Sequence, residues 1–378
     1  MNPKHAKLFQ ALTFKKGVTI SNRLIMAPMT TWASNDDYTI SDDEVKHYHK
    51  RVKAVGLVIT GCTRVAVNGI GFTNEFAGYD DNFIPSLKKL ATAAKKGGAP
   101  AILQIFHAGI RAIPNLIPGE DLVSASAFKI DGSFYSPNNK VTRALTHEEI
   151  LDIVCAFGET TRRAIEAGFD GVELHGAHGF LIQNFLSPLF NQRTDEWGGS
   201  LEKRLRFPLA VVKEIKRVIQ EHSTKPFLFG YRVSPEEPLE GGLRLNDVYV
   251  LLDNLIKEKI DYIHVSLVNL LTDKPINNSD NKTIIELILN RVNGNVPVIA
   301  AGGIRKPDDA VKALDLGLSM VALAKALVMN PNWVELTREG RVEEIETALS
   351  ISKVKEKAIP VKLLNYIKSA KGWFDIAA

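Results

Sequence analysis

The sequence predicts an α/β protein built as a single (β/α)8 TIM barrel, and two observations carry that prediction. Short apolar runs bounded by Gly, Pro or Asn recur along the 378 residues, and several are nearly continuous in Val, Ile, Leu or Ala. Strands that are buried on both faces of a parallel sheet have this composition. Amphipathic helical stretches fall between the runs, and strand followed by helix about eight times is typical of a barrel.

The elements follow one another in a regular order. The expected strands cover residues 23–29, 56–60, 101–106, 171–175, 227–233, 262–266, 296–301 and 320–324. One helix begins after Thr146, where T-H-E-E forms a capping box with Glu149. The other expected helices cover residues 84–96, 201–221, 245–258, 283–291, 307–316 and 333–348. The alternative, a doubly wound sheet, would normally have a Gly-rich turn after the first strand, where this chain has A-P-M-T.

No composition shift or low-complexity linker divides the chain, so we expect one domain over residues 1–378. The barrel should cover about 20–345, and a C-terminal helical appendage about 350–378. Residues 107–141 follow the third strand and are rich in Gly, Pro, Ser and Asn with little periodicity. We therefore expect an enlarged loop after strand 3 that builds or covers the active site.

Composition excludes several classes of protein. The net charge is only +4 and basic residues are scattered, so nucleic acid is not an expected partner. No apolar run approaches the roughly 18–20 residues of a membrane span, and the start lacks the apolar core of a secretory signal. Two cysteines, Cys62 and Cys155, cannot form a disulfide framework. The expectation is a cytoplasmic protein that does not bind membranes.

Two histidines follow the fourth strand as His175-Gly-Ala-His178, at the barrel end where active sites lie. A pair at this spacing could ligate a metal, hold a carbonyl oxygen or developing oxyanion, or serve only the structure. Glu173 precedes His175 by two residues, but no Cys or acidic residue shows a recognisable third-ligand spacing. We therefore expect a substrate or oxyanion site and no metal.

An anion site is expected after the seventh strand, in A-A-G-G-I-R-K-P at residues 300–307. Gly302 and Gly303 leave backbone N–H groups open, and Pro307 suits the first turn of the next helix. Phosphate is commonly bound there in this fold. Lys325 after strand eight strengthens this interpretation, although a tight turn and a surface lysine are the simpler alternatives.

Gln104 and Arg232 are polar residues within strands that otherwise appear buried. A buried charge requires a partner, so either an ion pair with Glu236 or Glu237 or an anionic ligand is expected beside Arg232. Cys62 lies at a strand end with no sign of a lowered thiol pKa, and we interpret it as a small wall residue.

Several strings in the sequence resemble the old yellow enzyme family of FMN-dependent ene-reductases, which are also described as NADH:flavin oxidoreductases. These strings are N-R-L-I-M-A-P-M-T at 22–30, Q-I-F-H-A-G at 104–109, H-G-A-H-G-F-L-I-Q-N-F-L-S-P at 175–188 and N-Q-R-T-D-E-W-G-G-S at 191–200. The resemblance extends from Leu8 to about Trp333, and the last two strings are the most specific.

The resemblance implies an oxidoreductase with non-covalent FMN across the C-terminal mouth of the barrel. NADH or NADPH would pass a hydride to flavin N5 and leave, and an electron-poor acceptor would take its place, which gives ping-pong kinetics. The acceptor could be an α,β-unsaturated carbonyl compound, a quinone or a similar molecule. Two rival functions remain: a non-redox phosphate-binding barrel enzyme of aldolase or isomerase type, and a flavin-binding protein with little turnover.

The resemblance also implies a role for each site residue. His175 and His178 would hold the acceptor's carbonyl oxygen, while Gln104 would bond the flavin pyrimidine and Arg232 would face N1 and O2, stabilising the reduced flavin. The remaining flavin contacts would be the backbone of Ala27, Pro28 and Met29, the Thr30 hydroxyl at O4, Cys62 beside the ring, and Gly302 with Gly303 at the phosphate.

Two positions depart from the family pattern. Ala324-Lys325 stands where the family usually has Gly-Arg, so the positive charge remains but the bidentate fork is lost. Phe180 replaces the tyrosine that delivers a proton to the substrate carbon in the family, which leaves that step without its usual donor. Trp373 and Phe374 in the tail could pack on a neighbouring copy, which would allow a homo-oligomer.

Overall fold

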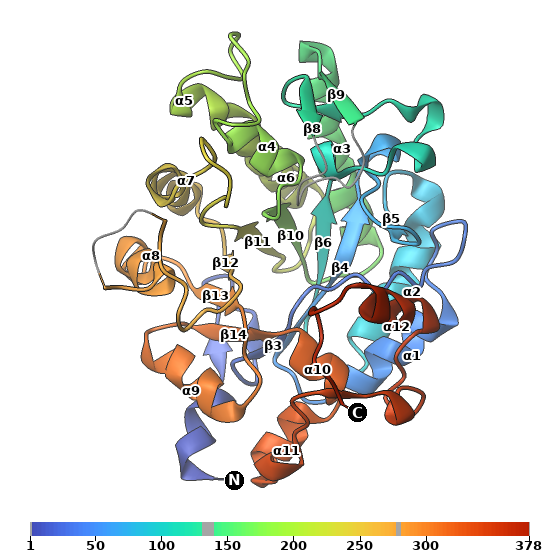
Figure 1. Ribbon diagram of the computed structural model, residues 1–378, viewed down its shortest axis with the longest axis vertical. Coiled ribbons are helices and arrows are strands. Elements are labelled where there is room, and N and C mark those ends of the chain that lie inside the picture. Colours follow the sequence, from blue (N-terminus) through green and yellow to red (C-terminus); the bar gives the residue numbers. More distant parts are fainter. Residues whose placement is uncertain (1, 131–139, 277–280, 378) are drawn as a thin grey trace.

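A closed barrel of parallel strands forms the centre of the computed structural model, which describes residues 2–130, 140–276 and 281–377 (Figure 1). Around the barrel the strand order is β3-β14-β13-β12-β11-β10-β6-β4, and a β3–β4 pairing closes the circle. The predicted fold class is therefore confirmed. The barrel strands are β3 (Leu24–Met26), β4 (Leu57–Arg64), β6 (Ala101–Phe106), β10 (Gly171–Gly176), β11 (Leu228–Val233), β12 (Tyr262–Ser266), β13 (Val298–Ala301) and β14 (Met320–Leu323).

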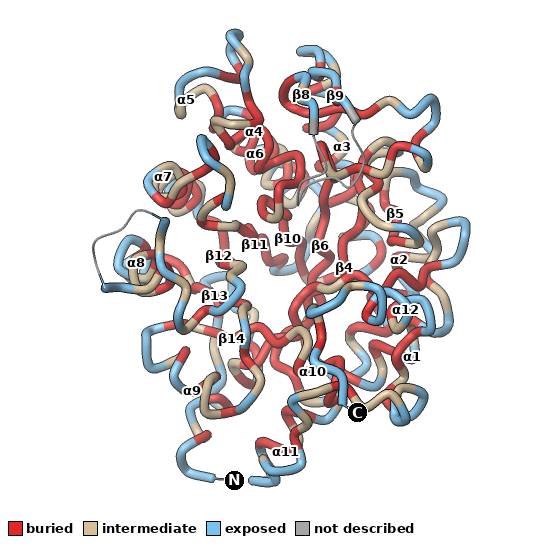
Figure 2. The backbone as a smooth tube through the Cα atoms, in the orientation of Figure 1, coloured by how far each residue is buried: buried red, intermediate tan, exposed pale blue. Residues whose placement is uncertain are grey.

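Helices surround the strands, and the outer faces of these helices are exposed (Figure 2). They are α1 (Asp42–Arg51), α2 (Ile84–Ala94), α3 (His147–Glu166), α4 (Leu181–Leu186), α5 (Leu201–Arg204), α6 (Arg206–His222), α7 (Leu245–Lys257), α8 (Ile284–Val292), α9 (Pro307–Asp315), α10 (Lys325–Met329), α11 (Trp333–Glu339) and α12 (Val361–Ser369). The predicted capping box of α3 is present, with Thr146 accepting from the Glu149 N–H. No helix in the described ranges is long and apolar enough to cross a membrane.

Side chains of the first halves of the strands fill the barrel interior. Leu57, Ile102 and Leu228 are fully buried there with Tyr262. A short hairpin of β1 (Leu12–Thr13) and β2 (Thr19–Ile20) adds Phe14 and Ile20 to this cluster. The sequence analysis did not predict the hairpin, because strands of two residues carry no periodicity.

Several predicted elements differ in their bounds, and the first strand, expected over 23–29, covers only Leu24–Met26. β4 runs on from Thr60 to Arg64, with an irregularity in its pairing to β6 between Ile59 and Cys62. The helix expected over 333–348 ends at Glu339, because Gly340 adopts a left-handed conformation with φ 82° that terminates it. The helix expected over 201–221 is divided at Leu205 into α5 and α6.

The segment after β6, where an enlarged loop was expected, contains several short elements, and residues 131–139 lie outside the described part of the chain. Its elements are η4 (Gly109–Arg111), η5 (Pro114–Leu116), η6 (Pro118–Glu120), β7 (Val123–Ser124), β8 (Phe128–Ile130) and β9 (Lys140–Ala144).

The C-terminal segment packs against the barrel through aromatic rings. Tyr366 of α12 stacks on Trp32, with ring centroids 3.8 Å apart, and Trp373 meets Trp32 edge-on at 5.9 Å. β16 (Ile376–Ala377) pairs with β15 (Leu349–Ser350), and Phe374 is buried within its own chain. These contacts involve Trp373 and Phe374, the two residues that could pack on a neighbouring copy, and a homo-oligomer stays a prediction. That the whole chain is one domain stays a prediction.

Glu44 gives the fold a dependence on pH. It is buried in α1 and accepts hydrogen bonds from the hydroxyl of Thr31, from Ser34 at 3.2 Å and from the Ser41 N–H at 3.1 Å. Burial outweighs these donors and raises the pKa of Glu44 to about 7. The unfolded chain therefore loses this proton at lower pH than the folded chain, so stability should fall as the pH rises from about 4.5 to about 7.

We expect the fall to be about 3 kcal/mol, because each pKa unit corresponds to about 1.4 kcal/mol. Urea unfolding between pH 5 and pH 8 measures it. Glu44→Gln should lose this part of the pH dependence, whereas Glu148→Gln, at an exposed position of α3, should retain it. An identical pH dependence in the wild type and Glu44→Gln would show that Glu44 is already ionised at pH 5.

Candidate functional site

Strand register brings the predicted polar residues together at two levels of the barrel. At the lower level, Gln104 lies opposite Cys62 on β4 and Glu173 on β10. Two residues further along, Arg232 lies opposite His175 and His264. Because all these strands are parallel, their carboxyl ends open at the same mouth.

The two histidines of the fourth strand lie side by side at this mouth, with ring centroids 4.9 Å apart and planes at 72°. Nδ1 of His175 accepts the Ala177 N–H at 3.3 Å, which leaves the His175 proton on Nε2. Nε2 of His178 hydrogen-bonds the Ser266 hydroxyl at 2.8 Å. Burial lowers the pKa of both imidazoles well below the usual value, and Arg232 lowers them further. The pair is therefore neutral and able to donate hydrogen bonds to an acceptor oxygen.

His178 owes its position to a strained turn. Its φ of 60° is unusual for a residue with a side chain, and Gly179 follows with φ 71°. The Ser234 hydroxyl accepts the His178 N–H at 3.0 Å, and Arg111 donates to the His178 carbonyl at 2.8 Å. Such strain is typical of functional sites, where the surrounding contacts hold it in place.

Arg232 is buried between the histidine pair and the barrel interior. Its Nη2 donates to Ser266 at 3.1 Å, while its Nε has no hydrogen-bond partner within the described residues. Glu236 and Glu237 do not pair with it: Glu237 accepts from Gln183 and Ser187 instead. The ion pair that would have explained Arg232 structurally is therefore absent among the described residues.

Cys62 and Thr30 line the mouth beside Gln104. The Cys62 thiol donates to Oε1 of Gln104 at 3.2 Å. Burial raises the pKa of Cys62 to about 12, which rules out a thiolate nucleophile at neutral pH. Cys62 packs in a cluster with Phe106, Ala108 and Phe180.

A turn after β13 contains the two glycines that are predicted to form the anion site. Gly302 and Gly303 have φ of 157° and 67°, and a Cβ on Gly302 would come within 2.8 Å of the Leu267 carbonyl. Within the described residues, the N–H groups of Gly303, Ile304 and Arg305 donate no hydrogen bond. Lys325 begins α10 close by, and its Nζ lies 5.8 Å from the centre of the Phe374 ring.

Phe180 forms an aromatic wall next to the histidines. Its ring centroid is 4.8 Å from that of His175, 4.9 Å from Phe106 and 6.0 Å from Phe72. Phe180 is buried and packs directly against the histidine pair.

Ser266 bonds two residues of this site and Arg305 lies in its anion-site motif, and neither was among the residues predicted from the sequence. The Ser266 hydroxyl connects Arg232 with His178. Ser266 is the last residue of the strand expected over 262–266, so the rule that site residues lie at strand ends could have identified it. Arg305 lies within the anion-site motif and pairs with Asp375 at 3.3 Å. No group of three or more His, Cys, Asp or Glu within the described ranges could hold a metal ion.

The residues present fit a flavin mononucleotide. A phosphate needs several N–H donors with a nearby cation, which the Gly303 turn and Lys325 provide. A flavin pyrimidine needs donors and an acceptor, which Arg232 and Gln104 provide. The unpartnered Nε of Arg232 and the close approach at Gly302 are the observations that support this fit.

Lys325→Ala is expected to raise the dissociation constant of FMN by roughly tenfold to a hundredfold, because a charge-assisted hydrogen bond is worth roughly 1.5–3 kcal/mol. Fluorescence titration of the apoprotein with FMN measures this. Lys312→Ala, at an exposed position of α9, is the matched control. Equal constants for Lys325→Ala and the wild type would remove Lys325 from the site.

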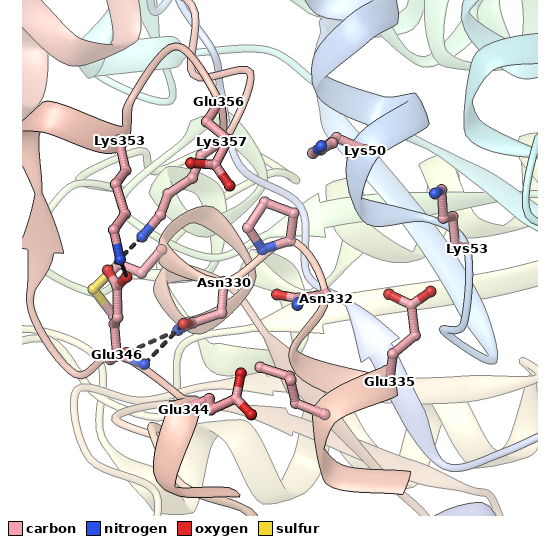
Figure 3. A pocket seen from close by; sticks show the side chains of 13 residues that line it. Lys50, Lys53, Asn330, Asn332, Glu335, Glu344, Glu346, Lys353, Glu356 and Lys357 are labelled. Atoms are coloured by element: carbon pink, nitrogen blue, oxygen red, sulfur yellow. Dashed lines mark hydrogen bonds and ion pairs between the residues drawn. The ribbon is translucent and has the colours of Figure 1, made fainter. Parts of the chain in front are cut away.

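A second hollow of about 320 Å³ lies away from the barrel mouth, between the end of α1, the start of α11 and residues 344–357 (Figure 3). Glu346 there bonds Lys353 and Lys357, and Asn330 bonds the Glu346 backbone. None of the predicted site residues lines this hollow. Its charged groups serve the contact between the C-terminal segment and the barrel.

The barrel with this mouth defines a class of protein, the flavin-dependent oxidoreductases. The family model described as the NADH:flavin oxidoreductase / NADH oxidase family matches residues 7–344. The chain belongs to this family. It is therefore an oxidoreductase whose cofactor is FMN and whose hydride donor is NADH or NADPH, and the non-redox alternative is set aside.

Individual relatives agree with this assignment. A Bacillus subtilis protein named "Probable NADH-dependent flavin oxidoreductase YqiG" is 45% identical over 373 residues, which is 99% of each chain. The NADH:fumarate oxidoreductase of Klebsiella pneumoniae is 36% identical over 95% of this chain, which spans only 39% of that relative. Among solved structures, morphinone reductase in complex with tetrahydroNAD has a TM-score of 0.76 and 26% identity, covering 88% of this chain and 90% of that one.

Proposed function

We propose that this oxidoreductase reduces an electron-poor, oxygen-bearing acceptor in a ping-pong reaction, with NAD(P)H and the acceptor using the same place in turn. The acceptor is an α,β-unsaturated carbonyl compound, a quinone or a similar molecule. The observation that carries the proposal is the neutral pair of His175 and His178, whose proton on Nε2 of His175 suits a carbonyl oxygen. Bound FMN would supply hydride acceptance and hydride donation.

The roles of the residues follow from their hydrogen-bonding groups. Gly302, Gly303 and Lys325 would hold the phosphate, and Gln104 and Arg232 the pyrimidine. Ala27, Pro28 and Met29 would present backbone to the ring, with Thr30 and Cys62 at its edge. His175 and His178 orient the acceptor by its oxygen, and their donors favour the charge that develops there.

Besides a hydride, an alkene acceptor needs a proton at its other carbon, and the Phe180 side chain has no proton to donate. An enone therefore depends on water or another side chain for this proton, whereas both oxygens of a quinone exchange protons with solvent. We infer that quinones are the better acceptors of this chain. Two relatives are named as fumarate and acrylate oxidoreductases. Alkenes that bear a carboxylate are therefore the second class of acceptor to test.

Anaerobic stopped-flow absorbance tests the proposal. The flavin should bleach on mixing with NADH or NADPH and recover its colour on mixing with a quinone, 2-cyclohexenone or acrylate. Steady-state rates against NAD(P)H at several acceptor concentrations should give parallel double-reciprocal lines. Intersecting lines would overturn the shared place, and a flavin that bleaches but is reoxidised by none of these acceptors would leave a flavin-binding protein with little turnover.

A further inference from the structure

Glu173 is a fully buried carboxylate at the lower level of the site, and the reaction proposed above does not use it. Its Oε1 accepts a hydrogen bond from Nε2 of Gln104 at 2.7 Å. Its Oε2 accepts from Nδ1 of His264 at 2.9 Å. These partners come from β6 and β12, so Glu173 on β10 joins three strands beneath the mouth.

The bond to Glu173 determines which way the Gln104 amide faces. An ionised carboxylate only accepts hydrogen bonds, so it must meet the NH2 end of the amide. The carbonyl oxygen of Gln104 is then directed to the other side, where it accepts from the Cys62 thiol at 3.2 Å. An uncharged partner at position 173 could accept or donate, and both orientations of the amide would become available.

Glu173 also balances the charge of Arg232. Burial lowers the pKa of His264, the neighbouring Glu173 opposes this shift, and His264 donates its Nδ1 proton to the carboxylate. Burial alone would raise the pKa of Glu173, but His264, Arg232 and Gln104 together hold it below its usual value. The negative charge of Glu173 thus acts on Arg232, the cation expected beside the flavin pyrimidine, through space, since no hydrogen bond joins the two side chains within the described residues.

We propose that Glu173 is a positioning residue for the flavin, acting through Gln104 and Arg232. It fixes the Gln104 amide with its oxygen toward the Cys62 thiol, and its negative charge offsets part of the Arg232 charge. Since electrons that arrive at the flavin add negative charge beside Arg232, the carboxylate of Glu173 lowers the flavin's electron affinity. The inference rests on the proposed flavin site and adds a residue that controls its redox potential.

Glu173→Gln is the sharpest test of the charge, because the amide has nearly the shape of the carboxylate but is neutral. It also replaces one of the two acceptor oxygens by an NH2 donor, so the Gln104 amide is no longer held in one orientation. Arg232 would then act without its counter-charge, so binding of reduced over oxidised FMN should rise about tenfold. For a two-electron couple this corresponds to about 30 mV toward positive potential. Equilibration with a reference dye under anaerobic conditions measures the potential, independently of any turnover.

Glu237→Gln is the matched control, since Glu237 is also fully buried and bonded to a glutamine, at 2.8 Å from Gln183, but faces α4. It should keep the wild-type potential. Glu173→Asp retains the charge but has a shorter side chain that no longer reaches Gln104 and His264. This variant should therefore bind FMN severalfold more weakly, with little change in the flavin potential. This variant also serves if Glu173→Gln does not fold.

The possible results separate the two proposals. If the wild-type chain binds FMN and Glu173→Gln has the same potential, Glu173 only fills the barrel and the inference fails. Wild-type FMN affinity in Glu173→Asp would overturn the orienting role of the carboxylate. If the wild-type chain binds no FMN, the proposed function fails, and the role of Glu173 fails with it.

Discussion

Replacing His175 and His178 together by alanine should abolish the long-wavelength charge-transfer band that a para-substituted phenol gives with the flavoprotein, while FMN remains bound. A phenolate oxygen resembles the oxygen of an acceptor, and the two neutral imidazoles are the donors that would hold it. Loss of one such donor typically costs about 10²–10³-fold in rate, so acceptor reduction should fall by at least that factor. Absorbance titration with the phenol measures the band.

The matched control is His222→Ala, at an exposed position at the end of α6, which should leave the band unchanged. Flavin content, read from the visible spectrum, distinguishes loss of the acceptor site from loss of the cofactor. A phenol complex of undiminished strength in the double variant would contradict the assignment of the pair. Stoichiometric zinc in the wild-type protein would do the same, because the imidazoles would then be ligands.

Phe180→Tyr should increase the rate of enone reduction by tens-fold or more and leave quinone reduction nearly unchanged. The ring of Phe180 lies 4.8 Å from that of His175, so a hydroxyl there would meet the acceptor beside the oxygen-binding pair. General acid catalysis typically contributes about 10²–10⁴-fold, and only the enone needs a proton at carbon. Stopped-flow reoxidation with 2-cyclohexenone and with a quinone measures both rates.

Reduction by NAD(P)H should be equal in the two proteins, because hydride transfer needs no side-chain proton. Phe72→Tyr is the matched control, since it adds the same hydroxyl to the neighbouring ring of the wall, 6.0 Å away from that of Phe180. Equal enone rates in the wild type and Phe180→Tyr would show that another group already supplies the proton, or that the edge of Phe180 faces away from the acceptor.

The barrel and the centre of the site were predictable because both depend on local patterns. Apolar runs identify the strands, and the rule that parallel strands end at one mouth selects Gln104, His175 and Arg232 without any knowledge of contacts. The bond from Glu173 to Gln104 was not predictable, because it joins residues 69 positions apart in the chain. E-x-H, the string that contains Glu173, is too common to indicate a pair across strands.

The contacts of the C-terminal segment were not predictable for the same reason. Lys325 was expected at the phosphate, but the residues around position 325 do not indicate that the Phe374 ring lies next to its ammonium group. The stacking of Tyr366 on Trp32 joins the segment to the loop that follows the first strand. The end of α11 at Gly340 was a local signal that the sequence analysis overlooked, because glycine after a helical stretch commonly stops the helix.

The pairing of β3 with β14 limits when the barrel can close during synthesis, because β14 is the last barrel strand in the chain. β3 pairs with β4 soon after both have left the ribosome, but its other neighbour, β14, begins only at Met320. Until then β3 has an open edge, and such long-range pairings form slowly. The Gly302 turn and Lys325 also come late in synthesis, so the expected phosphate site is complete only when β14 has been made. A ribosome stalled before β14 would hold a chain whose exposed strand edge invites aggregation and which has no place for the cofactor.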